Sequence, residues 1–206
     1  MKIVAIGDVH GCITQLQQAI QPLIGSQSEV VFLGDLIDRS PESKGDLRVL
    51  QLVHFMEQNP EAFGLSKVTV LTGNHEQMFV SAYREGLDKP LGDCWIHNGG
   101  DIDLLQDADP FIEWLEDRPT HYVFNDLLFV HAGVRPGVPL EEQSPFDLAW
   151  IRDPFLSTED HGLPYTVIHG HTPVPEVEVH PHRIAIDTGA CYGGYLTSLV
   201  IDTSPR

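Results

Sequence analysis

Residues 2–11 read KIVAIGDVHG, a short apolar run rich in branched side chains that is followed at once by a glycine, an aspartate and a histidine. Five runs of this composition occur along the chain, and each predicts a buried β-strand. After each run the sequence turns to glycine and to polar side chains that carry chemistry. The five runs are residues 2–6, 29–33, 67–71, 127–130 and 165–168.

Helical spacing of apolar side chains fills the gaps between the first three strands and follows the third. This alternation predicts an α/β fold, and the length of 206 residues fits a single domain over residues 1–206. Beyond residue 120, closely spaced strand patterns predict a second, more antiparallel sheet. We expect the glycine-rich residues 86–100 to form a surface loop that shapes a cleft. The expected helices are residues 13–20, 47–56 and 76–83, and the further strands are 121–124, 166–168, 177–180, 183–187 and 195–201.

Acidic residues outnumber basic residues by 30 to 12, which gives a formal net charge of −18. Such a surface repels nucleic-acid backbones and anionic lipids, so we expect neither nucleic acid nor membrane as a partner. No apolar stretch approaches the roughly 18 residues of a membrane span, and the sequence therefore indicates a cytoplasmic protein. Cys12, Cys94 and Cys191 are far apart and in no paired motif, which predicts reduced thiols.

The polar side chains that follow the five strands predict one shared site. Ligand sites in open α/β sheets collect at the carboxyl ends of the strands, so side chains from all five strand ends should meet. A lone Asp-x-His would more often be a turn and a surface histidine, but five such endings favour a metal site. The endings are GDVHG (7–11), GDLIDR (34–39), GNHE (73–76), HAG (131–133) and HGHT (169–172).

The residue types at these endings indicate the chemistry of that site. Asp8 and His10 stand on one side of an extended segment and can chelate one ion, and the two oxygens of Asp35 can bridge two ions. Oxygen and nitrogen donors without thiolates favour two divalent ions, Mn²⁺ first, with Fe or Zn²⁺ as alternatives. Two such ions form a clamp for attack on phosphorus, and Arg39 adds a fork for phosphate oxygens.

Several candidate site residues also have a simpler interpretation, in which they bind neither a metal nor a substrate. Asn74 can occupy a left-handed turn instead of binding a metal, and His169 competes with His171 for one ligand position. Arg152 can end a helix in an ion pair with Asp153. Arg135 can line the cleft or lie exposed in a turn, and Trp95 and Trp150 are interpreted as packing residues.

In this order and spacing, the five endings together with NGGD (98–101), HAGVRPGVPLEEQ (131–143), WIRDPF (150–155) and DTGACYGG (187–194) resemble the calcineurin-like metallophosphoesterases. Within them the chain is most similar to the compact bacterial and phage form of the phosphoprotein phosphatases. The resemblance covers residues 1 to about 203. It implies an α/β fold in which two mixed β-sheets form a sandwich flanked by helices, with two metal ions at the strand ends.

The resemblance also implies roles for individual residues. His75 with Asp38 resembles the family's acid pair, and we expect Asp38 to raise the pKa of His75 and keep the imidazole protonated. Arg39 and Arg152 resemble its phosphate-binding arginines. The first metal would be held by Asp8, His10 and Asp35, and the second by Asp35, Asn74, His131 and His171.

Two positions depart from the family pattern. Ser40 stands where a glycine usually follows the first arginine, and Thr72 stands where many protein phosphatases carry an arginine before GNHE. The first departure concerns the backbone turn after Arg39, and the second concerns the class of substrate that the protein hydrolyses.

The leading functional hypothesis is a metal-dependent phosphatase that hydrolyses phosphomonoesters through a metal-bridging hydroxide. Its substrate would be phosphoserine or phosphothreonine in proteins, or phosphotyrosine, or a small phosphoester, bound by Arg39, Arg152 and Arg135. The alternative is a hydrolase of dinucleoside polyphosphates such as diadenosine tetraphosphate. Asp38 favours the phosphomonoesterase, because some of the nucleotide enzymes have alanine there, whereas Thr72 favours the alternative. A non-catalytic phosphate-recognition scaffold is disfavoured, because none of the expected site residues is lost.

Overall fold

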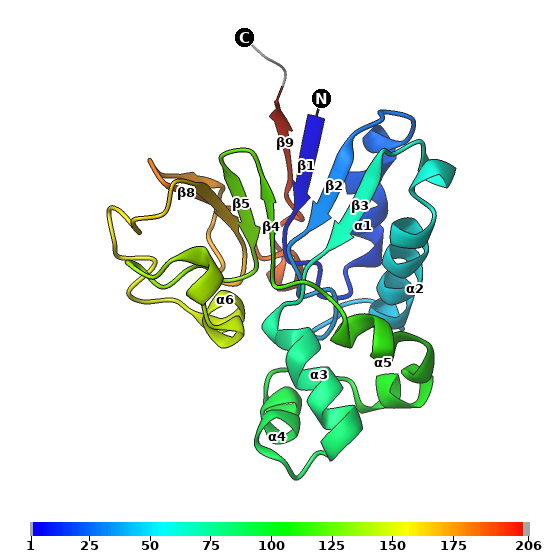
Figure 1. Cartoon of the computed structure of the whole chain (residues 1–206). Helices are drawn as coiled ribbons and strands as arrows, with labels where there is room; N and C mark the ends of the chain where they lie inside the picture. Colours follow the sequence, from blue (N-terminus) through cyan, green and yellow to red (C-terminus); the bar gives the residue numbers. More distant parts are fainter. Residues whose placement is uncertain (1, 204–206) are drawn as a thin grey trace.

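The computed structural model describes residues 2–203, and its strands form two sheets that lie face to face (Figure 1). The first sheet has the order β3-β2-β1-β9. In it β1, β2 and β3 are parallel, and β9 runs antiparallel to β1. Its strands are β1 (Lys2–Ile6), β2 (Glu29–Phe32), β3 (Lys67–Val70) and β9 (Ser198–Asp202).

The second sheet has the order β4-β5-β6-β8-β7 and is mixed. The pairs β5/β6 and β6/β8 are parallel, whereas β4/β5 and β7/β8 are antiparallel. The prediction of two mixed sheets is confirmed, but the last predicted strand, 195–201, belongs to the first sheet as β9. The strands of the second sheet are β4 (His121–Phe124), β5 (Leu127–Val130), β6 (Thr166–His169), β7 (Glu178–Val179) and β8 (Arg183–Ala185).

The continuous apolar run of β1 follows from burial on both faces of its sheet. Side chains alternate across a strand, so Ile3 and Ala5 face the second sheet, where they join Phe129 in one cluster. Val4 and Ile6 face the opposite way and pack in the cluster that includes the helices. All four of these β1 side chains are fully buried, as expected for a parallel strand covered on both sides.

Helices cover the outer face of each sheet (Figure 1). The side chains of α1 and α2 pack in the same cluster as the outer residues of β1 and β2. The short α6 lies against the second sheet, where Leu148 packs with Leu128 and Val130. The α-helices are α1 (Ile13–Ile20), α2 (Gly45–Gln58), α3 (Asn74–Glu85), α4 (Pro90–His97), α5 (Asp109–Glu116) and α6 (Pro145–Trp150), and the 3₁₀ helices are Gln21–Leu23, Pro60–Phe63, Ile102–Asp107, Leu140–Glu142 and Ala190–Tyr192.

The predicted surface loop at 86–100 is wrong, because α4 occupies most of this segment. Trp95 of α4 is fully buried, and its ring lies 5.3 Å from that of Phe79 on α3. Pro90 stands at the start of the helix, where proline is favoured. Burial of one large side chain therefore stabilises a helix of eight residues that has weak periodicity of its own.

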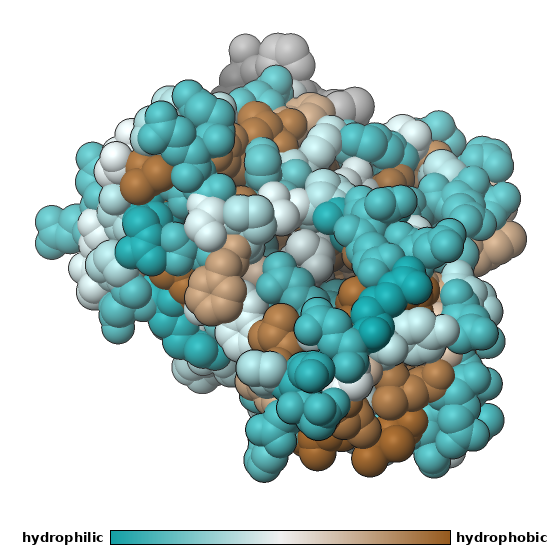
Figure 2. Space-filling model, turned by 60° about the horizontal axis from the view of Figure 1, so that its bottom comes forward, coloured by the Kyte–Doolittle hydropathy of each residue, from teal (hydrophilic) through white to brown (hydrophobic). Residues whose placement is uncertain are grey.

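Hydrophilic side chains cover most of the face shown in Figure 2, and apolar side chains gather mainly at its lower edge. Among residues 2–203, no helix has the length and apolar character that a bilayer crossing requires.

Candidate metal centre

The six predicted metal ligands follow the carboxyl ends of β1, β2, β3, β5 and β6. Two hydrogen bonds join segments from the two sheets at this point. The backbone N–H of His171 donates to Asp8 Oδ2 at 3.0 Å, and His131 Nε2 lies 3.0 Å from Asn74 Oδ1. The five strand endings therefore form one site, as the sequence predicts.

An unusual backbone conformation marks this edge. Among the described residues, eight that are not glycine have positive φ, and five of them are site residues. This conformation is disfavoured for L-residues by about 1 kcal/mol or more, and it concentrates at functional sites. Asn74 is not among them, which removes the left-handed-turn alternative for that residue. The five site residues are His10, Asp35, Asp38, Arg39 and His171.

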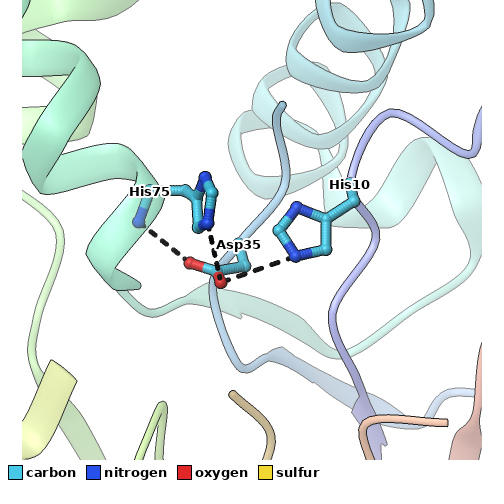
Figure 3. A group of neighbouring side chains, drawn as sticks. All are labelled: His10, Asp35 and His75. Atoms are coloured by element: carbon cyan, nitrogen blue, oxygen red, sulfur yellow. Dashed lines mark hydrogen bonds and ion pairs between the residues drawn. The ribbon is translucent and has the colours of Figure 1, made fainter. Parts of the chain in front are cut away.

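Asp35 lies at the middle of the site, with Oδ2 directed toward the imidazoles of His10 and His75 and Oδ1 accepting the backbone N–H of His75 (Figure 3). Oδ1 lies 3.3 Å from His131 Nε2, and Oδ2 lies 3.7 Å from His10 Nε2. Burial alone would raise the pKa of Asp35, but the facing imidazoles of His131 and His75 hold it well below its usual value. The carboxylate is therefore ionised, with one oxygen turned toward each half of the site, as a bridging ligand requires.

The backbone around Asp35 is fixed by Glu76, a residue of the GNHE motif that the sequence does not mark as a ligand. Its carboxylate is buried and accepts the backbone N–H groups of Asp35, Leu36 and Gly73, each at 2.8 Å. Charge-assisted hydrogen bonds of this kind are short and strong. Glu76 therefore joins the turns after β2 and β3 and orients Asp35.

Two groups of side chains have ligand atoms that all lie within 4.8 Å of one another: Asp35 with His131 and His171, and Asp35 with His10 and His75. The first group agrees with the predicted second metal site, and it contains His171 and not His169. His169 donates from Nδ1 to Gly170 O and packs against Phe155.

Unpartnered atoms test whether the site fits metal ions. Asp8 Oδ1 and His171 Nε2 are buried and have no hydrogen-bond partner. Such groups cost about 1–3 kcal/mol each in a protein interior, and a cation would satisfy both lone pairs. These atoms belong to two of the predicted ligands.

The histidines are also arranged as ligands. His10 donates from Nδ1 to Ile37 O at 2.8 Å, and His131 donates from Nδ1 to Leu33 O at 3.0 Å, which turns Nε2 of each toward the site. Burial lowers the pKa of His10 to about 4 and that of His171 to about 3, so both are neutral at pH 7. Although burial acts against it, the Asp35 carboxylate raises the pKa of His131 to about 9. The surrounding oxygens therefore favour positive charge, and the residues present fit two divalent ions.

Asp187 is a further carboxylate that sequence reasoning missed. It follows β8, is 4% exposed, and accepts the backbone N–H of Gly189 at 3.0 Å. Burial raises the pKa of Asp8, and the charge of Asp187 raises it further. The position of Asp187 at the end of the predicted strand 183–187 was the available signal. Its charge adds to the attraction for cations at the Asp8 side of the site.

The His75–Asp38 pair is present, with His75 Nδ1 2.5 Å from Asp38 Oδ2. Both side chains are almost fully buried. The expectation that the pKa of His75 is raised is wrong, because burial lowers it despite the nearby Asp35 carboxylate. Burial likewise raises the pKa of Asp38. Burial disfavours both charged forms, and a short hydrogen bond joins the two side chains.

The three predicted arginines have different surroundings. Arg39 reaches the site, with Nη1 3.2 Å from His10 Nε2. The positive charge of Arg152 contributes to the lowered pKa of His171, which puts it near the centre. Arg135 is held elsewhere, since Nε and Nη2 donate to the two oxygens of Asp147 at 2.7 and 2.6 Å. Its role in substrate binding remains a prediction.

The departure at Ser40 is accommodated locally. Ser40 does not have positive φ, and its hydroxyl donates to Gly11 O at 3.0 Å. The turn after Arg39 therefore forms without the usual glycine and is joined to the turn after β1.

Known proteins share this sequence and fold. Residues 1–195 match the family model described as calcineurin-like phosphoesterase. A Janthinobacterium sp. protein named bis(5'-nucleosyl)-tetraphosphatase, symmetrical, is 34% identical over 138 residues, which span 66% of this chain and 45% of that protein. The chain thus matches less than half the length of that relative.

Two further matches extend over nearly the whole chain. A Bacillus thuringiensis protein named bis(5'-nucleosyl)-tetraphosphatase PrpE [asymmetrical] is 26% identical, over 97% of this chain and 90% of that protein. A solved structure, the cold-active protein-tyrosine phosphatase of a psychrophilic Shewanella sp., has a TM-score of 0.68 at 21% identity, covering 98% of this chain and 75% of the other. The structural match shows a shared fold. The resemblance to the calcineurin-like metallophosphoesterases inferred from the motifs is confirmed.

Proposed function

We propose, from the premise that the chain belongs to the calcineurin-like phosphoesterase family, that it hydrolyses dinucleoside polyphosphates. The observation that carries this substrate class is the pair of sequence relatives named as tetraphosphatases, one of them matched over 97% of the chain. The motifs favoured a phosphomonoesterase, whereas the sequence relatives favour a hydrolase of dinucleoside polyphosphates.

Two divalent ions would be held by the six predicted ligands, and Mn²⁺, Fe and Zn²⁺ all suit this donor set. When bound, such ions supply Lewis acidity and lower the pKa of water. Asp35 would be shared between the two ions. The ligands are Asp8, His10, Asp35, Asn74, His131 and His171.

The other site residues supply binding and proton transfer. Arg39 and Arg152 would hold the oxygens of the phosphate under attack, and their charge stabilises the charge that develops there. Hydrolysis adds an oxygen of water to phosphorus and breaks the P–O bond to the leaving group. His75 would give its Nε2 proton to the leaving oxygen and recover one from the attacking water, while Asp38 orients the imidazole.

A cavity of about 700 Å³ beside Arg39 supports a substrate with a nucleoside end. This volume lies in the usual range of small-molecule sites. Its lining includes Asp101, Asp103 and Asp107, together with Arg39 and Lys44. Carboxylates accept hydrogen bonds from ribose hydroxyls and base amino groups and repel further phosphates. The cavity therefore suits the nucleoside, whereas the phosphate lies on the arginine side.

Phosphomonoesters remain a second candidate because of the His75–Asp38 pair. A serine or threonine alkoxide is a poor leaving group and needs a proton at its oxygen, whereas a nucleotide phosphate needs less help. A buried acid pair beside the centre is thus of most use with an alkyl ester.

A substrate panel tests the proposal. The Mn²⁺-loaded protein is assayed with diadenosine tetraphosphate, phosphoserine and phosphotyrosine peptides, and p-nitrophenyl phosphate, and the nucleotide products are separated by chromatography. We expect the highest kcat/KM for diadenosine tetraphosphate, with either two ADP or ATP plus AMP as products. A higher kcat/KM for phosphoserine peptides would reverse the order of the two candidates.

Removal of either arginine should weaken phosphate recognition and leave the metal content unchanged. We expect Arg39→Ala and Arg152→Ala to lower kcat/KM by about 10²–10³, the usual loss for one donor that stabilises developing charge. Arg84→Ala is the matched control, because the Arg84 guanidinium is exposed and donates to both oxygens of Glu116. If Arg152→Ala stays within about twofold of wild type, Arg152 is a structural residue and not a phosphate ligand.

A further inference from the structure

Trp95 makes a contact that its assignment as a packing residue does not explain. Its indole Nε1 donates to Asp38 Oδ1 at 2.8 Å, while the other oxygen of the same carboxylate faces His75 Nδ1 at 2.5 Å. Asp38 is fully buried, so water does not compete for these oxygens. A continuous hydrogen-bonded row thus runs from Trp95 through Asp38 to His75.

The indole that begins this row is rigidly held. Trp95 is fully buried and packs against Phe79. The backbone of Gly100 lies against its other side, so closely that a Cβ there would come within 2.3 Å of the indole ring. Gly100 also donates its N–H to Trp95 O at 3.0 Å. The indole N–H therefore has a fixed direction.

The same segment also fixes Arg39, the neighbour of Asp38. Asn98 accepts from Arg39 Nε at 3.0 Å through its backbone oxygen and from Nη2 at 3.3 Å through Oδ1. Gly99 accepts the backbone N–H of Arg39 at 3.1 Å. Asp38 and Arg39 have φ values of +72° and +60°, and these contacts hold them in that disfavoured conformation.

We infer that Trp95 is a positioning residue for proton transfer: its N–H locks the Asp38 carboxylate so that His75 keeps Nε2 directed toward the centre. In the structure Nε2 lies 4.0 Å from Asp35 Oδ2 (Figure 3). Without the indole donor the carboxylate is free to rotate about its Cβ–Cγ bond, and the imidazole loses its fixed orientation. This inference rests on the proposed role of His75 but not on the identity of the natural substrate.

The variant Trp95→Phe tests the inference, since it keeps an aromatic ring beside Phe79 and removes the indole N–H. Loss of one partner of a buried hydrogen bond corresponds to a factor of about 10–100. We expect kcat for phosphoserine to fall by about that factor, and kcat for p-nitrophenyl phosphate, whose leaving group needs little protonation, to fall by less than about threefold. The content of two metal ions per chain should stay unchanged.

A matched control is Trp114→Phe. Trp114, in α5, also donates its indole N–H to a carboxylate, Glu57 Oε2 at 2.7 Å, but away from the site. Both variants lose one hydrogen bond from an indole N–H to a carboxylate, which is buried at Trp95 and part-buried at Trp114. Only Trp95→Phe should change the ratio of the two rates.

Two further measurements separate positioning from damage. In a His75→Asn background, Trp95→Phe should cause no further loss with phosphoserine, because the row then leads to no proton donor. The proton in the short His75–Asp38 bond should give a downfield NMR signal that shifts in Trp95→Phe and not in Trp114→Phe, whatever substrate the protein prefers. Equal losses on both substrates, additive losses in the double variant, or an unchanged NMR signal would each overturn the inference. Failure to cleave diadenosine tetraphosphate would count against the proposed function alone.

Discussion

Asp35→Asn is expected to remove most of both metal ions from the protein and to lower kcat/KM by about 10³-fold or more, because each oxygen of this carboxylate faces a different half of the site. An amide keeps the shape of the side chain but offers one neutral oxygen and no charge. Elemental analysis of the purified variant, compared with two ions per chain in the wild type, is the measurement.

Glu29→Gln is the control for this change. Glu29 is buried and pairs with Lys67, but it lies at the start of β2, the strand whose other end leads to Asp35. Its loss should affect stability and leave the metal content at two. One ion in the wild type, or an unchanged content in Asp35→Asn, would contradict the bridging assignment.

His75→Asn is expected to slow hydrolysis of phosphoserine by about 10²–10⁴, the usual range for general acid catalysis, and to slow p-nitrophenyl phosphate much less. The reason is that an aryl leaving group is stable as an anion, whereas an alkyl leaving group takes a proton as the P–O bond breaks. The measurement is a plot of log kcat against the pKa of the leaving group, for wild type and variant at equal metal content.

His97→Asn is the control, because His97 is exposed on α4 and donates from Nδ1 to the backbone oxygen of Asp93 on its own helix. It should reproduce the wild-type plot. Parallel plots for wild type and His75→Asn would mean that His75 supports the metal site but does not give a proton to the leaving group.

The strands and the meeting of their ends could be predicted from the sequence because both depend on local pattern. The run at 2–6 forms β1 with the predicted bounds, and its burial on two faces explains why its apolar residues are continuous. The sheet to which β9 belongs could not be predicted, since pairing of β1 with β9 joins the two ends of the described chain. Strand patterns carry no information on such distant partners.

The sequence did not reveal the residues that orient the metal ligands and the acid pair. Glu76 and Asp187 were visible in quoted motifs, but their roles depend on backbone N–H groups and on a neighbouring carboxylate that only the fold supplies. Trp95 lay in a segment without clear periodicity, and its contact with Asp38 spans 57 residues. Chemistry-bearing side chains are recognisable from type and spacing, whereas the groups that orient them are set by tertiary contacts.

The left-handed backbone at five site residues also bears on how this protein responds to selection. Glycine adopts positive φ without the penalty that aspartate, arginine or histidine meets there. Substitution by glycine therefore removes the backbone strain at residues 10, 35, 38, 39 and 171, but it also removes a side chain of the metal centre. A library sorted for heat resistance alone should accumulate glycine at these positions and lose activity as it gains stability, so sorting has to include turnover at every round.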